Sequence, residues 1–305
     1  MVQQDSIGMD MKPVILIEQQ SDLSAMISKL ERVACISVDT ESNSFYAYYN
    51  RICLIQLSTE DEDYIIDPLT TLNIKELGEI FARPDIEKVF HAAPNDIAGL
   101  RRDFKFVISN IFDTAIAAKL LGYKQLGLAK ILNEHFGINL DKKWQRHDWG
   151  RRPLRREQLE YARHDTHYLI ALRQILTAEL MARQLLDAAK EAFEKACHQQ
   201  FQEKPFRPGD FLHIYGAQSL DMIGKRVLQA LYLFRENEAR RRDRAPFRIL
   251  TNETLVRLAH QRPKNIRDIS KIKGIPRTYN NLRTAHPLLE LIRKHEGPGE
   301  DVVVR

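Results

Sequence analysis

The chain has 305 residues, of which 44% are hydrophobic and 29% are charged, with a formal net charge of +5. This length allows a sizeable core and about two domains, and this composition is typical of a soluble protein. No apolar run approaches the ~18 residues of a membrane span, and the first residues lack a basic start followed by an apolar stretch, so we expect a cytoplasmic protein with no membrane partner.

The charge is divided unevenly along the chain. Residues 1–203 carry 25 Lys and Arg against 30 Asp and Glu, whereas residues 204–305 carry 21 against 11. The C-terminal third is therefore the basic part. Such asymmetry favours an anionic polymer as partner, most often a nucleic acid.

The first region predicts a sheet. Residues 33–39 are small or apolar on both faces, as in a strand at the centre of a covered sheet. Residues 51–58 and 63–67 also read as strands, joined by the polar turn 59–62 and stopped by Pro68. Together these segments predict a three-strand meander.

Two carboxylates close the first of these strands. Asp39 and Glu41 lie two residues apart, so they share one face if the strand persists. Anions held that close repel each other unless a cation or a proton lies between them. The alternative is a strand end that simply turns into solvent, where acidic residues are common.

Helices are interleaved with the later strands. The pattern predicts helices at about 74–81, 96–102, 115–121 and 126–136, and strands at 86–90 and 110–113. Asp96 falls in the first turn of a helix that follows a strand, where an acidic residue also serves as an ordinary cap or dipole partner. This order of elements predicts a mixed α/β sheet with helical cover.

A loop and a long helix follow. Residues 142–155 are rich in Arg, Trp and His with no apolar period, whereas the pattern from Arg156 onward is helical. Tyr161 and Asp165 lie four residues apart on that helix and therefore share one face. Alone, such a pair is weak evidence, but it adds a fourth acid to Asp39, Glu41 and Asp96.

Three ordered motifs carry a resemblance to a known family. Asp-Thr-Glu at 39–41 closes a strand, His-Ala-Ala-Pro-Asn-Asp at 91–96 opens a helix, and Tyr-Ala-Arg-His-Asp at 161–165 lies within one. They resemble the exonuclease motifs of the DEDD superfamily. The spacing is that of its tyrosine branch, because the histidine branch would require His where this chain has Glu160. Arg-Pro-Leu at 152–154 is similar to ribonuclease D in particular, and the resemblance covers about residues 13–200.

The resemblance implies a ribonuclease H-like α/β fold and two divalent ions, Mg²⁺ or Mn²⁺, which suit oxygen ligands without His or Cys. Asp39, Glu41 and Asp165 would hold the ion that activates water, and Asp39 would bridge to the second. Asp96 would complete the site, directly or through water. Tyr161 would hydrogen-bond the attacking water. Three histidines close to these motifs are not expected to be ligands: His91, His164 and His167.

The C-terminal part predicts a small all-α domain. Residues 203–210 contain two prolines and a glycine and read as a linker between an exonuclease domain at 13–202 and helices at 211–294, with 295–305 as a tail. The helical part resembles the HRDC module that accompanies ribonuclease D, where it binds nucleic acid. Longer ribonuclease D proteins carry two such modules, and this chain has one. The basic cluster 240–244 is a candidate for phosphate contacts.

The resemblance implies a monomeric 3′-5′ exonuclease that releases nucleoside 5′-monophosphates from RNA with a free 3′ end, such as tRNA precursors. Single-stranded DNA is the nearest alternative substrate, because recognition of the 2′-hydroxyl depends on pocket geometry. A non-catalytic nucleic-acid-binding protein of this fold is the alternative of another class.

Overall fold

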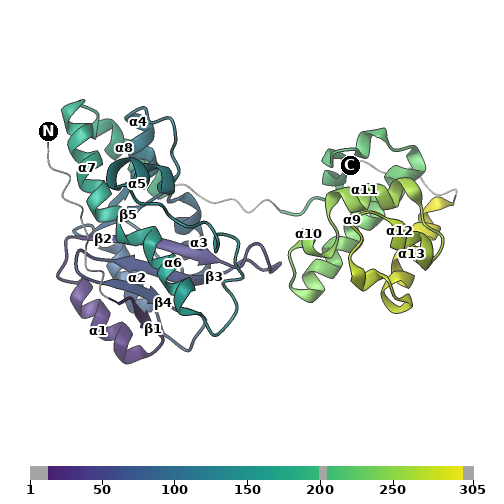
Figure 1. Ribbon diagram of the computed structural model, residues 1–305, viewed down its shortest axis with the longest axis horizontal. Helices are drawn as coiled ribbons and strands as arrows, with labels where there is room; N and C mark the ends of the chain where they lie inside the picture. Colours follow the sequence, from purple (N-terminus) through teal and green to yellow (C-terminus); the bar gives the residue numbers. More distant parts are fainter. Residues whose placement is uncertain (1–12, 199–204, 298–305) are drawn as a thin grey trace. The chain divides into compact units, whose positions relative to one another are not determined.

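The computed structural model describes residues 13–198 and 205–297. The chain forms two compact units, an α/β unit and a helical unit (Figure 1). The helical unit includes residues 44–50 from the first half of the chain as well as the C-terminal third. Within the described ranges, no helix has the length and apolar character needed to cross a bilayer.

A six-stranded mixed sheet forms the centre of the α/β unit, in the order β1-β4-β3-β2-β5-β6. Its strands are β1 (Ile15–Ile17), β2 (Cys35–Ser42), β3 (Ile52–Ser58), β4 (Asp63–Ile66), β5 (Glu87–Phe90) and β6 (Ile111–Asp113). The β2-β3 and β3-β4 pairs are antiparallel and the other three are parallel, which confirms the predicted meander and the mixed sheet. The three-residue edge strand β1 was not predicted.

Helices cover the sheet. They are α1 (Gln20–Leu30), α2 (Lys75–Ala82), α3 (Pro94–Phe104), α4 (Thr114–Leu120), α5 (Leu128–Phe136), α6 (Arg156–His167), α7 (Leu169–Ala182) and α8 (Leu186–His198). Helix α6 packs across β2, β3 and β4 (Figure 1). The segment predicted as one helix from Arg156 onward breaks at Tyr168, where α6 ends and α7 begins.

Strand β2 presents different side chains to its two faces. The Ser37 hydroxyl donates a hydrogen bond to the Thr166 carbonyl of α6 (2.9 Å), so the face that carries Ser37 lies against α6. Ile36 points to the opposite face and is fully buried. Because side chains alternate along a strand, Asp39 and Glu41 lie on the same face as Ser37, which is the face that packs against α6.

The helical unit is built around one long helix, α9 (Met222–Arg242), which packs against α11 and α13. The other helices are η1 (Pro208–His213), η2 (Ala217–Ser219), α10 (Pro246–Ile249), α11 (Asn252–Gln261), α12 (Ile266–Lys271), η3 (Arg277–Tyr279) and α13 (Leu282–Glu296). The all-α prediction is thereby confirmed. Helix η1 starts inside the predicted linker, and α13 continues into the predicted tail; residues 199–204 and 298–305 lie outside the described residues.

The C-terminal end of α9 is engaged within the helical unit. Arg240 donates to the hydroxyl of Tyr48 (2.9 Å), and Arg241 pairs with Glu238 (2.9 Å). The Asp243 carboxylate accepts the backbone N–H groups of Tyr48 and Tyr49 (3.0 and 2.9 Å). These contacts hold residues 44–50 in the helical unit, and a phosphate-binding role for the basic cluster remains a prediction.

Candidate active site

Four of the five predicted site residues line one cavity at the end of β2. Asp39 and Glu41 come from the strand and Tyr161 and Asp165 from α6, and the cavity has a volume of about 400 Å³. The spacing of two on β2 and of four on α6 places each pair on one face, as predicted. The antiparallel ladder with β3 and the cover by α6 bring the two pairs together.

Asp96 reaches the same place from the start of α3. Its Oδ1 accepts the hydroxyl of Thr40 (2.6 Å) and the backbone N–H of Thr40 (3.1 Å), so it is tied to the residue between Asp39 and Glu41. No side chain caps α3, and the carboxylate is turned toward β2. It lies behind Thr40 and not on the wall of the cavity.

Burial raises the pKa of all four carboxyl groups, and for Asp39, Glu41 and Asp165 the other acids of the cluster add to the shift. Burial raises the pKa of Asp39 well above its usual range, with further contributions from Asp96, Asp165 and Glu41. Burial also raises the pKa of Glu41 well above its usual range, and the charges of Asp165 and Asp96 add to this shift. Burial raises the pKa of Asp96 to about 6 against the opposing hydrogen bonds from Thr40, and it raises the pKa of Asp165 to about 7 with Asp96 adding repulsion. Ionising all four groups would gather negative charge in a buried place, and a cation bound there would stabilise it.

The chemistry of this donor set fits a hard divalent cation, because all four groups offer carboxylate oxygens. Among the residues that the structure describes, however, no three His, Cys, Asp or Glu side chains form a ready-made metal cage. Binding of an ion there would need the carboxylate oxygens to converge, which rotation of these side chains would allow.

These pKa shifts predict that the metal-free protein loses stability as the pH rises. Unfolded Asp side chains titrate near pH 4, whereas folded Asp96 and Asp165 titrate at about 6 and 7. Between these values the folded state keeps protons that the unfolded state has lost, so raising the pH favours unfolding. In EDTA, the free energy of unfolding measured in urea should fall less between pH 5 and pH 8 for Asp165→Asn than for the parent protein. The exposed control Asp61→Asn should match the parent. Equal losses in all three proteins would contradict this account.

Tyr161 is placed as a hydrogen-bond donor. Burial and the charges of Asp165, Glu41 and Asp39 raise its pKa, so the hydroxyl stays protonated at neutral pH. Its ring stacks on Trp149 with centroids 6.0 Å apart and an interplanar angle of 27°. The packing fixes the ring, and the hydroxyl is close enough to Asp165, Glu41 and Asp39 for their charges to act on it.

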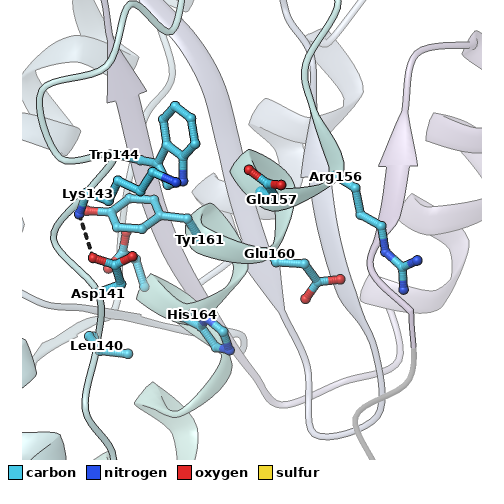
Figure 2. A pocket seen from close by; sticks show the side chains of 10 residues that line it. Leu140, Asp141, Lys143, Trp144, Arg156, Glu157, Glu160, Tyr161 and His164 are labelled. Atoms are coloured by element: carbon cyan, nitrogen blue, oxygen red, sulfur yellow. Dashed lines mark hydrogen bonds between the residues drawn. The ribbon is translucent and has the colours of Figure 1, made fainter.

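A second cavity of about 520 Å³ adjoins the first, since Tyr161 and Asp165 line both. Figure 2 shows the Tyr161 ring pointing from α6 toward Trp144 and Lys143, with Asp141 beside them. The backbone N–H of Lys143 donates to Asp141 (2.8 Å), and the Lys143 ammonium group lies 5.0 Å from the Trp144 ring centroid. This cavity offers an aromatic face next to the acidic cluster.

The three histidines near the motifs occupy different environments. His91 borders the first cavity, which Asp39, Glu41 and Asp165 line, and its ring shares a hydrogen bond with the Thr114 hydroxyl (2.8 Å). His164 lines the second cavity, next to Trp144 and Tyr161. His167 lies 2.8 Å from the Asp63 carboxylate. Two of the three therefore border space that a substrate could occupy.

Three residues of the site were not singled out from the sequence. Thr40 was part of a quoted motif, but its tether to Asp96 depends on the approach of α3, and no sequence pattern predicts that approach. Trp144 lies in residues 142–155, which were predicted only as a loop. No regular spacing in that segment marks it as a site residue. Gln56 faces Asp39 across the β2-β3 ladder, and the register of the predicted meander could have revealed it.

Comparison with protein families also finds two parts in the chain. Residues 14–181 match the family described as 3′-5′ exonuclease, and residues 224–292 match the HRDC domain. The first match contains all five predicted site residues.

Individual relatives agree with these matches. Protein RRP6-like 2 of Arabidopsis thaliana is 30% identical over 297 residues, covering 93% of this chain and 33% of that protein. Exosome complex component 10 homolog of Caenorhabditis elegans is 34% identical over 258 residues, covering 83% of this chain and 30% of that protein. The chain thus spans about a third of the length of these curated relatives.

Solved structures extend the similarity to the fold. The catalytic core of RRP6 from Trypanosoma brucei superposes with a TM-score of 0.83 at 27% identity, covering 93% of this chain and 79% of that one. RNase D from Escherichia coli, described as an exoribonuclease involved in structured RNA processing, superposes with a TM-score of 0.68 at 27% identity, covering 94% and 76%.

Proposed function

Because the chain belongs to the ribonuclease D-like 3′-5′ exonucleases of the DEDD superfamily and carries an HRDC domain, we propose that it is a metal-dependent exoribonuclease. It would hydrolyse the last phosphodiester bond at an RNA 3′ end and release a nucleoside 5′-monophosphate. The observation that carries this proposal is the meeting of Asp39, Glu41, Asp96 and Asp165 beside Tyr161.

The carboxylates would hold two divalent ions, Mg²⁺ or Mn²⁺. Asp39, Glu41 and Asp165 would hold one, Asp39 would bridge to the other, and Asp96 would complete the set. Ions bound there supply a lowered pKa for the attacking water and stabilise charge on the attacking and leaving oxygens. The protein's part is to fix the carboxylates, and the two hydrogen bonds from Thr40 to Asp96 do so at one corner.

Tyr161 would orient the attacking water. Its hydroxyl is protonated because its pKa is raised, so it donates a hydrogen bond and does not act as the base. The adjoining cavity would receive the terminal nucleotide, with the Trp144 ring available for base stacking. Stacking places no demand on base identity, which suits an enzyme that removes successive nucleotides.

RNA is the proposed substrate, and precursors of tRNA or other structured RNAs are the proposed source of 3′ ends. The RNase D neighbour supports this, since that protein is described as an exoribonuclease involved in structured RNA processing. The basic helical unit would help to hold the polymer, and we propose that the protein works in the cytoplasm as a monomer.

An assay with matched RNA and single-stranded DNA labelled at the 5′ end tests this function. With Mg²⁺, RNA should shorten stepwise from the 3′ end and yield nucleoside 5′-monophosphates, and EDTA should stop the reaction. Faster shortening of DNA than of RNA would favour the DNA alternative. Binding without shortening of either polymer would favour a non-catalytic nucleic-acid-binding protein.

A further inference from the structure

A buried amide beside the acidic cluster has no role in the reaction described so far. Gln56 lies on β3 and is fully buried. Neither its side-chain oxygen nor its side-chain nitrogen has a hydrogen-bond partner among the described residues. Leaving a buried amide unsatisfied is costly, so such a group in a folded core calls for an explanation.

The strand register places Gln56 directly opposite Asp39. Side chains of paired residues on antiparallel strands point to the same face with Cβ atoms about 4.5–5.5 Å apart. On its other side, Gln56 is paired with Ile65 of β4, which is apolar. Asp39 is therefore the polar neighbour that the ladder provides for this amide.

The next polar pair along the same face is already satisfied. Ser58 follows Gln56 by two residues and shares a hydrogen bond with the Thr166 hydroxyl (2.7 Å), while Ser37 donates to the Thr166 carbonyl (2.9 Å). Ser37 and Ser58 therefore form hydrogen bonds to α6, whereas the side-chain amide of Gln56 does not. The contrast singles out Gln56 as the polar group on this face that faces a predicted ligand and lacks a bond of its own.

We propose that Gln56 is a positioning residue for the metal site. Its Nε2–H group donates to an oxygen of the Asp39 carboxylate when that group is ionised and holds a cation, and this fixes the direction of the other oxygen. The inference rests on the proposed function, because it assumes that Asp39 binds a divalent ion. Partners of this kind orient ligands, and their loss typically lowers metal affinity 10–100-fold.

Removing the amide should affect metal affinity and thermal stability differently. Gln56→Met keeps an unbranched side chain of similar length but has no group to satisfy. The variant should bind Mn²⁺ about 10–100-fold more weakly than the parent. In EDTA, its Tm should be equal to or higher than that of the parent, because an unpartnered buried amide has been removed.

Calorimetric titration with Mn²⁺ alone and thermal melting in EDTA measure both quantities without any assay of turnover. Ser58→Ala is the matched control, since it lies on the same strand and face but loses an existing hydrogen bond. It should lower the Tm in EDTA and leave Mn²⁺ affinity unchanged. Gln56→Leu provides a second apolar variant if the Met side chain packs poorly.

Mn²⁺ affinity within twofold of the parent for both Gln56 variants would overturn the positioning role and leave the proposed exonuclease intact. Equal weakening by Ser58→Ala would also overturn it, because the effect would then be a general one of packing. A parent protein that binds no Mn²⁺ would instead refute the proposed metal site, and this inference with it.

Discussion

Asp39→Asn is expected to lower kcat on RNA by at least about 10³-fold. The amide has the size of the carboxylate but not its charge, and Asp39 is proposed to contact both ions. A bound ion contributes several kcal/mol of charge stabilisation, and each 1.36 kcal/mol is tenfold in rate. Rapid-quench measurement of nucleoside 5′-monophosphate release at saturating RNA and Mg²⁺ gives the rate directly.

The same variant should remain folded and should still bind RNA. In EDTA, at a pH above the raised pKa of Asp39, it should melt at a higher temperature than the parent, because one member of a buried cluster of like charges is then neutral. Asp61→Asn, an exposed acid in the turn between β3 and β4, is the matched control and should retain full activity. A parent-like kcat for Asp39→Asn would show that the roles assigned to the carboxylates are wrong.

Tyr161→Phe is expected to lower kcat by about 10²-fold, the size typical of losing one well-placed hydrogen bond in the transition state. KM should change little, because the Phe ring keeps the stacking on Trp149. Steady-state kinetics on a short single-stranded RNA separates the two parameters.

The pH profile of Tyr161→Phe distinguishes an orienting role from a general base. If the hydroxyl only orients water, the profile should keep the shape of the parent at a lower level. Loss of a rate-controlling ionisation in the variant would show instead that Tyr161 moves the proton. Tyr168→Phe, one residue beyond α6 and outside both cavities, should behave like the parent.

The parts of the fold that the sequence predicted correctly have strong local patterns. The meander was predicted because residues 33–39, 51–58 and 63–67 are apolar and bounded by turns. Strand β1 and helix α1 were not: β1 has three residues at a sheet edge, and its pairing with β4 is set by tertiary contact. The break at Tyr168 was missed because apolar periodicity continues across it.

The acidic residues of the site were predictable because regular spacing gives each pair a common face. Their meeting depends on how α3 and α6 dock on β2, which spacing does not encode, and there the family resemblance supplied the expectation. The place of residues 44–50 was not predictable. Their contacts are with residues almost 200 positions away, such as Tyr48 with Asp243, and a local pattern carries no sign of them.

Four carboxylates from β2, α3 and α6 are proposed to gather around divalent cations. Diffraction from crystals soaked in Mn²⁺, measured at the manganese absorption edge, would locate such ions. We predict an anomalous peak about 2.1 Å from carboxylate oxygens of Asp39, Glu41 and Asp165. An anomalous map from Mn²⁺-saturated crystals without a peak among these residues would contradict it.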